Sequence, residues 1–358
     1  MKLVRALIDN AARAPGEVGK EASNETLCPQ TALPKAPVLG WDSFWPLRPA
    51  GLPRVADLPH RYTTSGRAAL LAALRLAALP PGSGVLVPSY HCPTMVAPAV
   101  ELGAVPVFYP LDAHGAPDLA WLETANLQGV RVLLAAHFFG LPQPMSRVRD
   151  WCSRHGIRLI EDCAHALFGT AGAKPIGAWG DVAIASLTKF LPVPEGGCLI
   201  VNQGQPPQAL ARCGTGVHVK AAIDILDVGA RRGQLTGLNS LINGAMGGLR
   251  ALRGLRGRRS ASHGPPPVEA TVAPPNTAAA AGTPAATFVS PMADDFYIDA
   301  PLAHRDLARP CRWVAVALPR QRIVERRRAH YAELTRRLSG HTGLRPLLPD
   351  LPTDSVPY

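Results

Sequence analysis

The chain has 358 residues, of which 47% are hydrophobic and 18% charged, so it holds enough apolar material for a sizeable core, which argues against wholesale disorder. Its net charge of +11 favours anionic partners, but only 6% of the residues are aromatic and they do not alternate with basic ones, which argues against nucleic-acid binding by base stacking. The longest apolar runs are shorter than the roughly 18 residues that predict a membrane span.

Residues 1–60 are rich in proline and are predicted to be irregular, whereas 61–203 alternate between apolar runs and helical patterns. The predicted strands cover 84–89, 105–112, 130–137, 157–165, 181–187 and 197–203. The predicted helices between them begin near 65, 93, 118 and 144. Almost continuously apolar strands that alternate with helices are typical of a mostly parallel sheet flanked by helices. The sequence therefore predicts an α/β domain over 61–203.

Beyond residue 203 the composition changes, and we predict a basic and then Ala/Pro-rich insertion or linker over 204–288 that is partly disordered. Seven arginines and no acidic residue lie between 229 and 260, which is typical of a solvated face or of weak contact with acidic membrane lipid. Residues 289–358 are predicted to form a small, incomplete C-terminal α/β domain. It contains an amphipathic helix over 321–338 with Val324, Tyr331, Leu334 and Leu338 on its apolar stripe.

Three chemically complementary groups stand at strand or helix ends. Lys189 follows the predicted strand 181–187, Asp162 and His165 end the strand 157–165, and Ser65-Gly66-Arg67 begins a helix. Ligands of open α/β sheets bind at the carboxyl ends of the strands, so we expect these groups to lie together. A helix amino terminus suits a phosphate, a lysine amine forms a Schiff base with an aldehyde, and a carboxylate keeps a pyridine nitrogen protonated. Pyridoxal 5′-phosphate (PLP) requires all three.

The chain resembles the DegT/DnrJ/StrS family of PLP-dependent aminotransferases in several stretches that follow the family's order. They are TTSGRAALLAAL, GSGVLVPSYHCPTMVAPAVELGAVPVFYPLD, VLLAAHFFGLPQPM, IRLIEDCAHALFG, GDVAIASLTKFLPVPEGGCLIV and, later, VERRRAHYAEL. The resemblance implies a PLP-dependent transferase of fold type I that works as a homodimer. It also implies transfer of an amino group from a donor such as glutamate to a keto substrate, by default a nucleotide-linked keto sugar in polysaccharide biosynthesis. Lys189 argues against the family's dehydratases, which place a histidine there.

By the same resemblance, Lys189 forms the Schiff base and moves the substrate proton, Asp162 pairs with the pyridinium nitrogen, and His165 contacts the cofactor ring or its phenolic oxygen. The phosphate is expected to contact Ser186, Ser65, Gly66 and Arg67, where Arg67 replaces the family's usual Thr or Ser. No metal ligand is expected.

Two further positions depart from the family pattern. Cys92 stands where the family commonly places an aromatic that stacks on the ring, so we expect Tyr90 or His91 to replace it and Cys92 to be a small buried filler. Arg305 is the one cation expected where the family reaches a neighbouring subunit's cofactor phosphate. We expect His137, which ends the strand 130–137, to be structural.

The sequence leaves an alternative open, a PLP-binding homologue of altered or lost activity that acts as a binding or regulatory partner. NAD and ATP are not expected as cofactors, since neither a GxGxxG nor a GxxxxGK[ST] loop is present. The seven cysteines are scattered and form no CxxC pair, which indicates reduced thiols and a cytoplasmic location.

Overall fold

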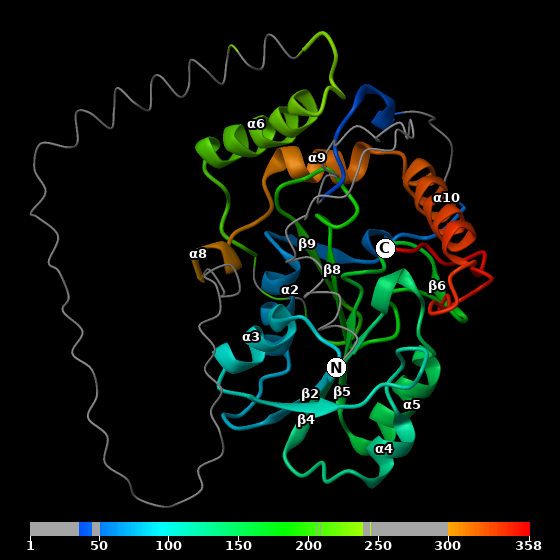
Figure 1. Cartoon of the computed structure of the whole chain (residues 1–358). Helices are drawn as coiled ribbons and strands as arrows, with labels where there is room; N and C mark the ends of the chain where they lie inside the picture. The colour runs from blue at the N-terminus through cyan, green and yellow to red at the C-terminus, as the bar shows by residue number, and fades with distance from the viewer. Residues whose placement is uncertain (1–35, 45–50, 206, 208, 239–243, 245–299) are drawn as a thin grey trace, which may run out of the picture. The chain divides into compact units, whose positions relative to one another are not determined.

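The computed structural model describes residues 36–44, 51–205, 207, 209–238, 244 and 300–358, and a seven-stranded sheet runs through them (Figure 1). Its strand order is β1-β9-β8-β5-β4-β2-β3. The strands are β1 (His60–Thr63), β2 (Gly84–Pro88), β3 (Val105–Tyr109), β4 (Val130–Ala136), β5 (Arg158–Asp162), β8 (Val182–Ser186) and β9 (Gly197–Val201). Neighbours from β3 to β8 pair in parallel, and β9 pairs antiparallel with β8 and β1. The predicted mostly parallel sheet is confirmed, as is every predicted strand.

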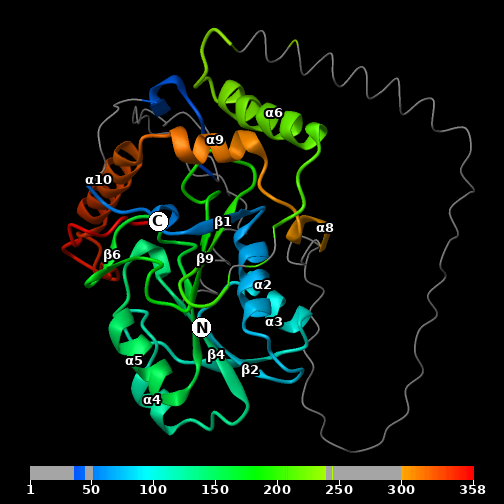
Figure 2. The same ribbon diagram turned by 180° about the vertical axis from the view of Figure 1, so that it is seen from behind.

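Helices cover both faces of this sheet, because side chains along each buried strand alternate between the two. One face packs on α2 (Gly66–Leu76) and α3 (Pro93–Glu101). The other packs on α5 (Met145–His155), with Leu122 of α4 (Leu119–Thr124) in the same core (Figure 2). Among the described residues, no helix is long and apolar enough to cross a bilayer.

The edge strand β1 begins at His60, the last residue of the segment predicted to be irregular, and is not among the strands predicted from the sequence. His60–Thr63 has no apolar run, since this strand is only half-buried, so its pattern gave no strand signal. Thr63 pairs with Gly197 of β9. A Cβ on Gly197 would lie 2.3 Å from the carbonyl oxygen of Ser65, so only glycine lets β9 approach the start of α2 this closely.

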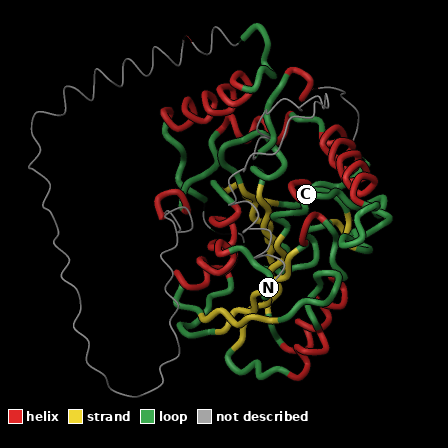
Figure 3. The backbone as a smooth tube through the Cα atoms, viewed as in Figure 1, coloured by secondary structure: helices red, strands yellow, loops and turns green. Residues whose placement is uncertain are grey.

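A helix within the predicted linker 204–288 is a second difference. Helix α6 (Thr215–Arg231) buries Ala221 and Ile225 in the main core and contacts α9 (Arg309–Ala317) (Figure 3). Charged residues that pair along the helix, such as Lys220 with Asp224, stand between its apolar positions. The helical spacing of the apolar residues was therefore not recognised in the sequence. Apart from residue 244, the stretch 239–288 lies outside the described residues, and with it most of the basic segment 229–260.

Residues 300–358 contain α8 (Ala300–Ala303), α9 and α10 (Arg320–Leu338), and no strand occurs among them. The predicted helix over 321–338 is therefore present, whereas the α/β character predicted for this region is not observed. Apolar residues of α9 join the core under the main sheet, and 36–358 form one compact unit. The domain boundaries at 60, 203 and 288 stay predictions.

The predicted apolar stripe of α10 is wrong. Of its four residues only Val324 is buried, whereas Leu334 and Leu338 are 58% and 43% exposed. The helix is held instead by arginines along its first half. One of them, Arg320, pairs with Asp57 at 2.5 Å.

Candidate active site

A cavity of about 390 Å³ lies at the carboxyl ends of β5 and β8, between them and the amino end of α2. Every site residue predicted from the sequence lines it: Ser65, Gly66, Arg67, Tyr90, His91, Asp162, His165, Ser186 and Lys189. Four further polar residues in its wall, which were not assigned to the site beforehand, are Cys92, Thr94, His137 and Thr188. The volume is in the range of small-molecule sites.

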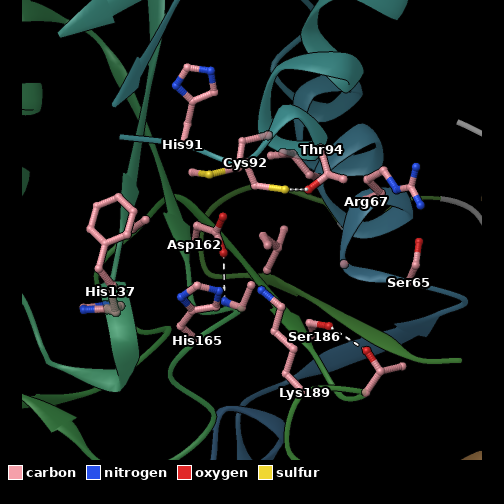
Figure 4. Close-up of a pocket in the computed structure, with 18 of the residues that line it drawn as sticks. Ser65, Arg67, His91, Cys92, Thr94, His137, Asp162, His165, Ser186 and Lys189 are labelled. Carbon is pink, nitrogen blue, oxygen red and sulfur yellow. Dashed lines mark hydrogen bonds between the residues drawn. The ribbon is translucent and has the colours of Figure 1, made fainter. Parts of the chain in front are cut away.

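Lys189 and Asp162 face each other across the cavity (Figure 4). Asp162 ends β5 on the face that packs on α2, and its Oδ1 accepts the backbone N–H of Ala164 at 2.8 Å. Burial raises the pKa of Asp162, and the Ala164 N–H and the Lys189 amine partly oppose this shift. Burial also lowers the pKa of Lys189, with Asp162 opposing. A partly desolvated amine opposite a carboxylate is an arrangement suited to a reactive lysine.

The amino end of α2 forms the part of the cavity suited to an anion. Ser65 is its N-cap, and its hydroxyl accepts the N–H of Ala68 at 3.1 Å. A Cβ on Gly66 would lie 3.4 Å from the Cβ of Ser186, so β8 and the helix start approach closely here. Ser186 and Thr188 share a hydroxyl–hydroxyl hydrogen bond of 3.2 Å. Hydroxyls beside a helix amino terminus are typical of phosphate sites.

His165 is fixed between the chain's last residue and the loop after β4. Its ring stacks on Tyr358, with centroids 4.4 Å apart, and its Nδ1 accepts the N–H of Phe139 at 3.4 Å. Burial and the Lys189 amine lower the pKa of His165 to about 4. The imidazole is therefore neutral near pH 7, with its hydrogen on Nε2.

The residues expected to replace the stacking aromatic are arranged differently. The His91 ring stacks on Phe108 at 4.8 Å and points away from Lys189 (Figure 4). Tyr90 is 60% exposed and meets Phe138 edge-on. Cys92, expected to be a buried filler, is exposed and accepts the hydroxyl of Thr94 at 3.1 Å, because it stands at the start of α3 rather than inside the core.

Arg305 does not line the cavity of its own chain. Its expected contact with a neighbouring subunit's cofactor phosphate stays a prediction. Its guanidinium pairs with Glu195 at 2.5 Å and donates to the Cys213 sulfur. Glu195 also accepts the N–H of Ala308 at the start of α9. Arg305 therefore ties the loop after Lys189 to α9, a tertiary role that its sequence position does not reveal.

His137 borders the cavity, and its imidazole forms a buried pair with Glu161, which the sequence interpretation overlooked. Glu161 precedes Asp162 and therefore points to the opposite face of the sheet. Its carboxylate accepts a hydrogen bond from His137 Nε2 (2.9 Å) and from the backbone N–H groups of Gly177, Trp179 and Gly180. His137 Nδ1 accepts the N–H of Gln143, which leaves the hydrogen on Nε2. The expectation that His137 is structural agrees with these contacts.

Glu161→Gln is expected to cost about 3 kcal/mol of unfolding free energy. The amide NH₂ would face backbone N–H donors that the carboxylate oxygens accept in the unmodified chain. Burial alone would raise the pKa of Glu161, but the hydrogen bonds from His137 and the backbone hold it below 4.5. A lowered folded pKa contributes stability above 4.5 that is lost as the pH falls through the folded value. Urea titrations should therefore show a difference in unfolding free energy between the unmodified chain and Glu161→Gln that is large at pH 7 and smaller in acid.

The matched control is Glu123→Gln, since Glu123 is an exposed partner of Arg154. This change should stay within about 0.5 kcal/mol. Equal losses in both variants would contradict a special role for Glu161.

Residues 61–217 match the family model of the DegT/DnrJ/EryC1/StrS aminotransferases. The match covers less than half of the chain. The family recognised from the sequence is thus confirmed, over a stretch that ends shortly after β9 and the start of α6.

Curated relatives match over the same region. A UDP-N-acetyl-3-dehydro-alpha-D-glucosamine 3-aminotransferase of Acidithiobacillus ferrooxidans is 32% identical over 34% of this chain and 33% of its own. A GDP-perosamine synthase of Vibrio cholerae is 30% identical over 40% of each chain. A dTDP-3-amino-3,4,6-trideoxy-alpha-D-glucose transaminase of Streptomyces venezuelae is 35% identical over 37% of this chain and 35% of its own. The chain thus matches one-third to two-fifths of the length of these relatives.

Among solved structures, an aminotransferase from Psychrobacter cryohalolentis aligns with a TM-score of 0.40 and 25% identity, over 42% of this chain and 39% of that chain.

Proposed function

We propose that this chain binds PLP and acts as an aminotransferase, moving an amino group from a donor such as glutamate to a nucleotide-linked keto sugar. One observation carries the proposal: a lysine amine, a buried carboxylate, a neutral imidazole and a hydroxyl-lined helix start converge on one cavity in a stretch that matches the aminotransferase family. The amino-sugar transaminases among the relatives support the class of substrate.

The cavity fits PLP in the chemistry of its wall. The amino end of α2 with Ser65, Gly66 and Ser186 would hold the phosphate, and Arg67 lies at the same end. Asp162 would face the pyridine nitrogen from across the cavity. When bound, PLP supplies an aldehyde that reacts with amines and a ring that accepts an electron pair.

The chain's own residues would bind the cofactor and move protons. Because burial lowers the pKa of Lys189, its Nζ is deprotonated more often at neutral pH than an exposed lysine, so it can attack the aldehyde and later accept a proton. A protonated ring nitrogen would favour the ionised form of Asp162 and offset its burial. His165, neutral with its hydrogen on Nε2, can donate to an oxygen in the cavity and hold the ring in one plane.

We further propose a homodimer and a cytoplasmic location, as the family resemblance implies. The positive net charge supports an anionic substrate such as a nucleotide-linked sugar. Contact of the basic segment 229–260 with membrane lipid remains a weaker proposal. Sedimentation with and without PLP tests the dimer, and a monomer that still transfers amino groups would contradict it.

A PLP-binding homologue of altered activity is the second candidate, and the exposed Cys92, which stands where the family commonly places a stacking aromatic, favours it. Incubation of the PLP-loaded chain with glutamate separates the two. An aminotransferase releases 2-oxoglutarate and keeps the amino group on the cofactor, in an amount stoichiometric with bound PLP. A chain that binds PLP but releases no 2-oxoglutarate or other keto acid favours the second candidate. A chain that binds no PLP rules out both.

A further inference from the structure

Three consecutive arginines of α10 reach three different parts of the chain. Arg326 is exposed and pairs with Asp42 at 3.1 Å. Arg328 donates to the carbonyl oxygens of Pro352 and Ser355, each at 2.6 Å. Arg327 donates to the carbonyl oxygen of Lys189 at 2.6 Å and to that of Pro357 at 3.4 Å. Successive side chains of a helix point about 100° apart, so one turn of α10 serves all three.

The surroundings of Arg327 are unusual for a cation. Its guanidinium carbon lies 4.3 Å from the centroid of the Phe190 ring and 5.4 Å from that of Tyr358. Its hydrogen bonds go to backbone carbonyl oxygens of Lys189 and Pro357, and burial lowers its pKa. A desolvated cation is costly unless hydrogen bonds and aromatic faces compensate. The two carbonyl oxygens and the two aromatic rings therefore fix the position of the Arg327 guanidinium, and the guanidinium in turn fixes theirs.

What Arg327 holds is the wall around the Lys189 amine. Lys189 Nζ lies 5.3 Å from the centroid of the Tyr358 ring, which also stacks on His165. The backbone N–H of Tyr358 donates to the carbonyl oxygen of Phe139, and Val356 is fully buried, so this segment is seated on the loop after β4. Gly140 makes room for it, because a Cβ there would lie 2.2 Å from the carbonyl oxygen of Val356.

We propose that Arg327 is a positioning residue for Lys189. Its planar fork joins the backbone of Lys189 to the Pro357-Tyr358 segment, which fixes the direction of the lysine side chain relative to the His165 ring. Arg327 itself does not line the cavity. A lysine at this position would keep the charge but could not span both carbonyl oxygens with the same geometry. The proposal rests on the proposed function only where it concerns reaction with PLP.

The first test compares Arg327→Met with Arg326→Met, its exposed neighbour. Each chain is incubated with PLP, reduced with borohydride at timed intervals and digested, and pyridoxyl labelling of Lys189 is measured relative to the exposed Lys220. We expect Arg327→Met to slow labelling of Lys189 on the order of tenfold, because a small misplacement of a reacting group costs rate steeply. Arg327→Lys should fall in between, and Arg326→Met should match the unmodified chain.

The second test does not use the cofactor. Hydrogen exchange of the peptide that spans 187–193 should accelerate in Arg327→Met and stay unchanged in Arg326→Met, since the amides of Phe190 and Leu191 bond back to Leu187 within the held loop. Unchanged exchange together with unchanged labelling would overturn the proposal. If Lys189 of the unmodified chain is labelled no faster than Lys220, the proposed cofactor role fails instead, and the exchange result alone decides on Arg327.

Discussion

Lys189→Ala is expected to abolish the stoichiometric covalent attachment of PLP at this position, leaving only slow labelling of exposed lysines such as Lys220, and to lower amino transfer on the order of 10²–10⁴-fold. The structure gives the reason: the Lys189 amine is the one that points across the cavity toward Asp162 (Figure 4). The measurement is borohydride reduction after incubation with PLP, followed by mass spectrometry of the intact chain and of its peptides.

Lys174→Ala is the matched control, since Lys174 lies over the Trp179 ring on a small hairpin outside the cavity. It should keep full attachment of PLP at Lys189.

The unfolding stability of Lys189→Ala distinguishes a loss of function from a loss of folding. Burial lowers the pKa of Lys189, so at pH values below its ordinary pKa of 10.5 the buried charged amine destabilises the folded chain. The alanine variant should therefore unfold at an equal or higher urea concentration at pH 7. Stoichiometric labelling in Lys189→Ala would contradict the proposed role.

Asp162→Asn is expected to separate activity from stability even more clearly. Amino transfer should fall on the order of 10²–10³-fold, because a neutral amide cannot hold a ring nitrogen in its protonated form. The apo chain should be at least as stable as before at pH 7. The asparagine side chain keeps the oxygen that accepts the Ala164 N–H but removes a buried charge.

The pH dependence follows from the direction of the pKa shift. Burial raises the pKa of Asp162 above 3.8, so the folded chain holds a proton that the unfolded chain has released, and stability falls as the pH rises through this interval. The amide of the Asp162→Asn variant cannot titrate, so its stability advantage should appear above that interval and vanish below pH 3.8. The urea midpoints of Asp162→Asn and the unmodified chain, measured from below pH 3.8 up to pH 7, test this pH dependence. A variant that loses activity and stability together at pH 7 would favour a purely structural Asp162.

The sheet could be predicted from local pattern because each of its central strands is buried on both faces and therefore reads as an apolar run. Edge strand β1 has one protected face and gave no such run. Helix α6 buries only a narrow face, so its signal was lost beside the glycine- and arginine-rich residues that follow. The exposed second half of α10 shows the opposite case. The helical spacing of Leu334 and Leu338 predicts that they share one face of the helix, but it does not predict whether another part of the protein covers that face.

The candidate site could be assembled from the sequence because its residues end parallel strands or begin a helix, positions that topology brings to one edge. Arg327 and Tyr358 could not be found this way. Arg327 meets Lys189 from 138 residues away, through a carbonyl oxygen that every residue type carries. The pairing of Arg305 with Glu195 could not be predicted for the same reason, since the two residues, 110 apart in the chain, become neighbours only in the folded chain.

The way α10 is attached makes the site responsive to ionic strength. This helix buries one apolar side chain, Val324, packs Ile323 partly against the core, and is also held by arginine contacts such as Arg320 with Asp57. Dissolved ions screen exposed pairs of this kind, with a screening length near ~8 Å at physiological salt. Because Arg327 lies on the same helix, a loosened α10 would also release the backbone of Lys189. Concentrated salt should therefore loosen the hold on Lys189, in addition to any competition of its anions for the anion site.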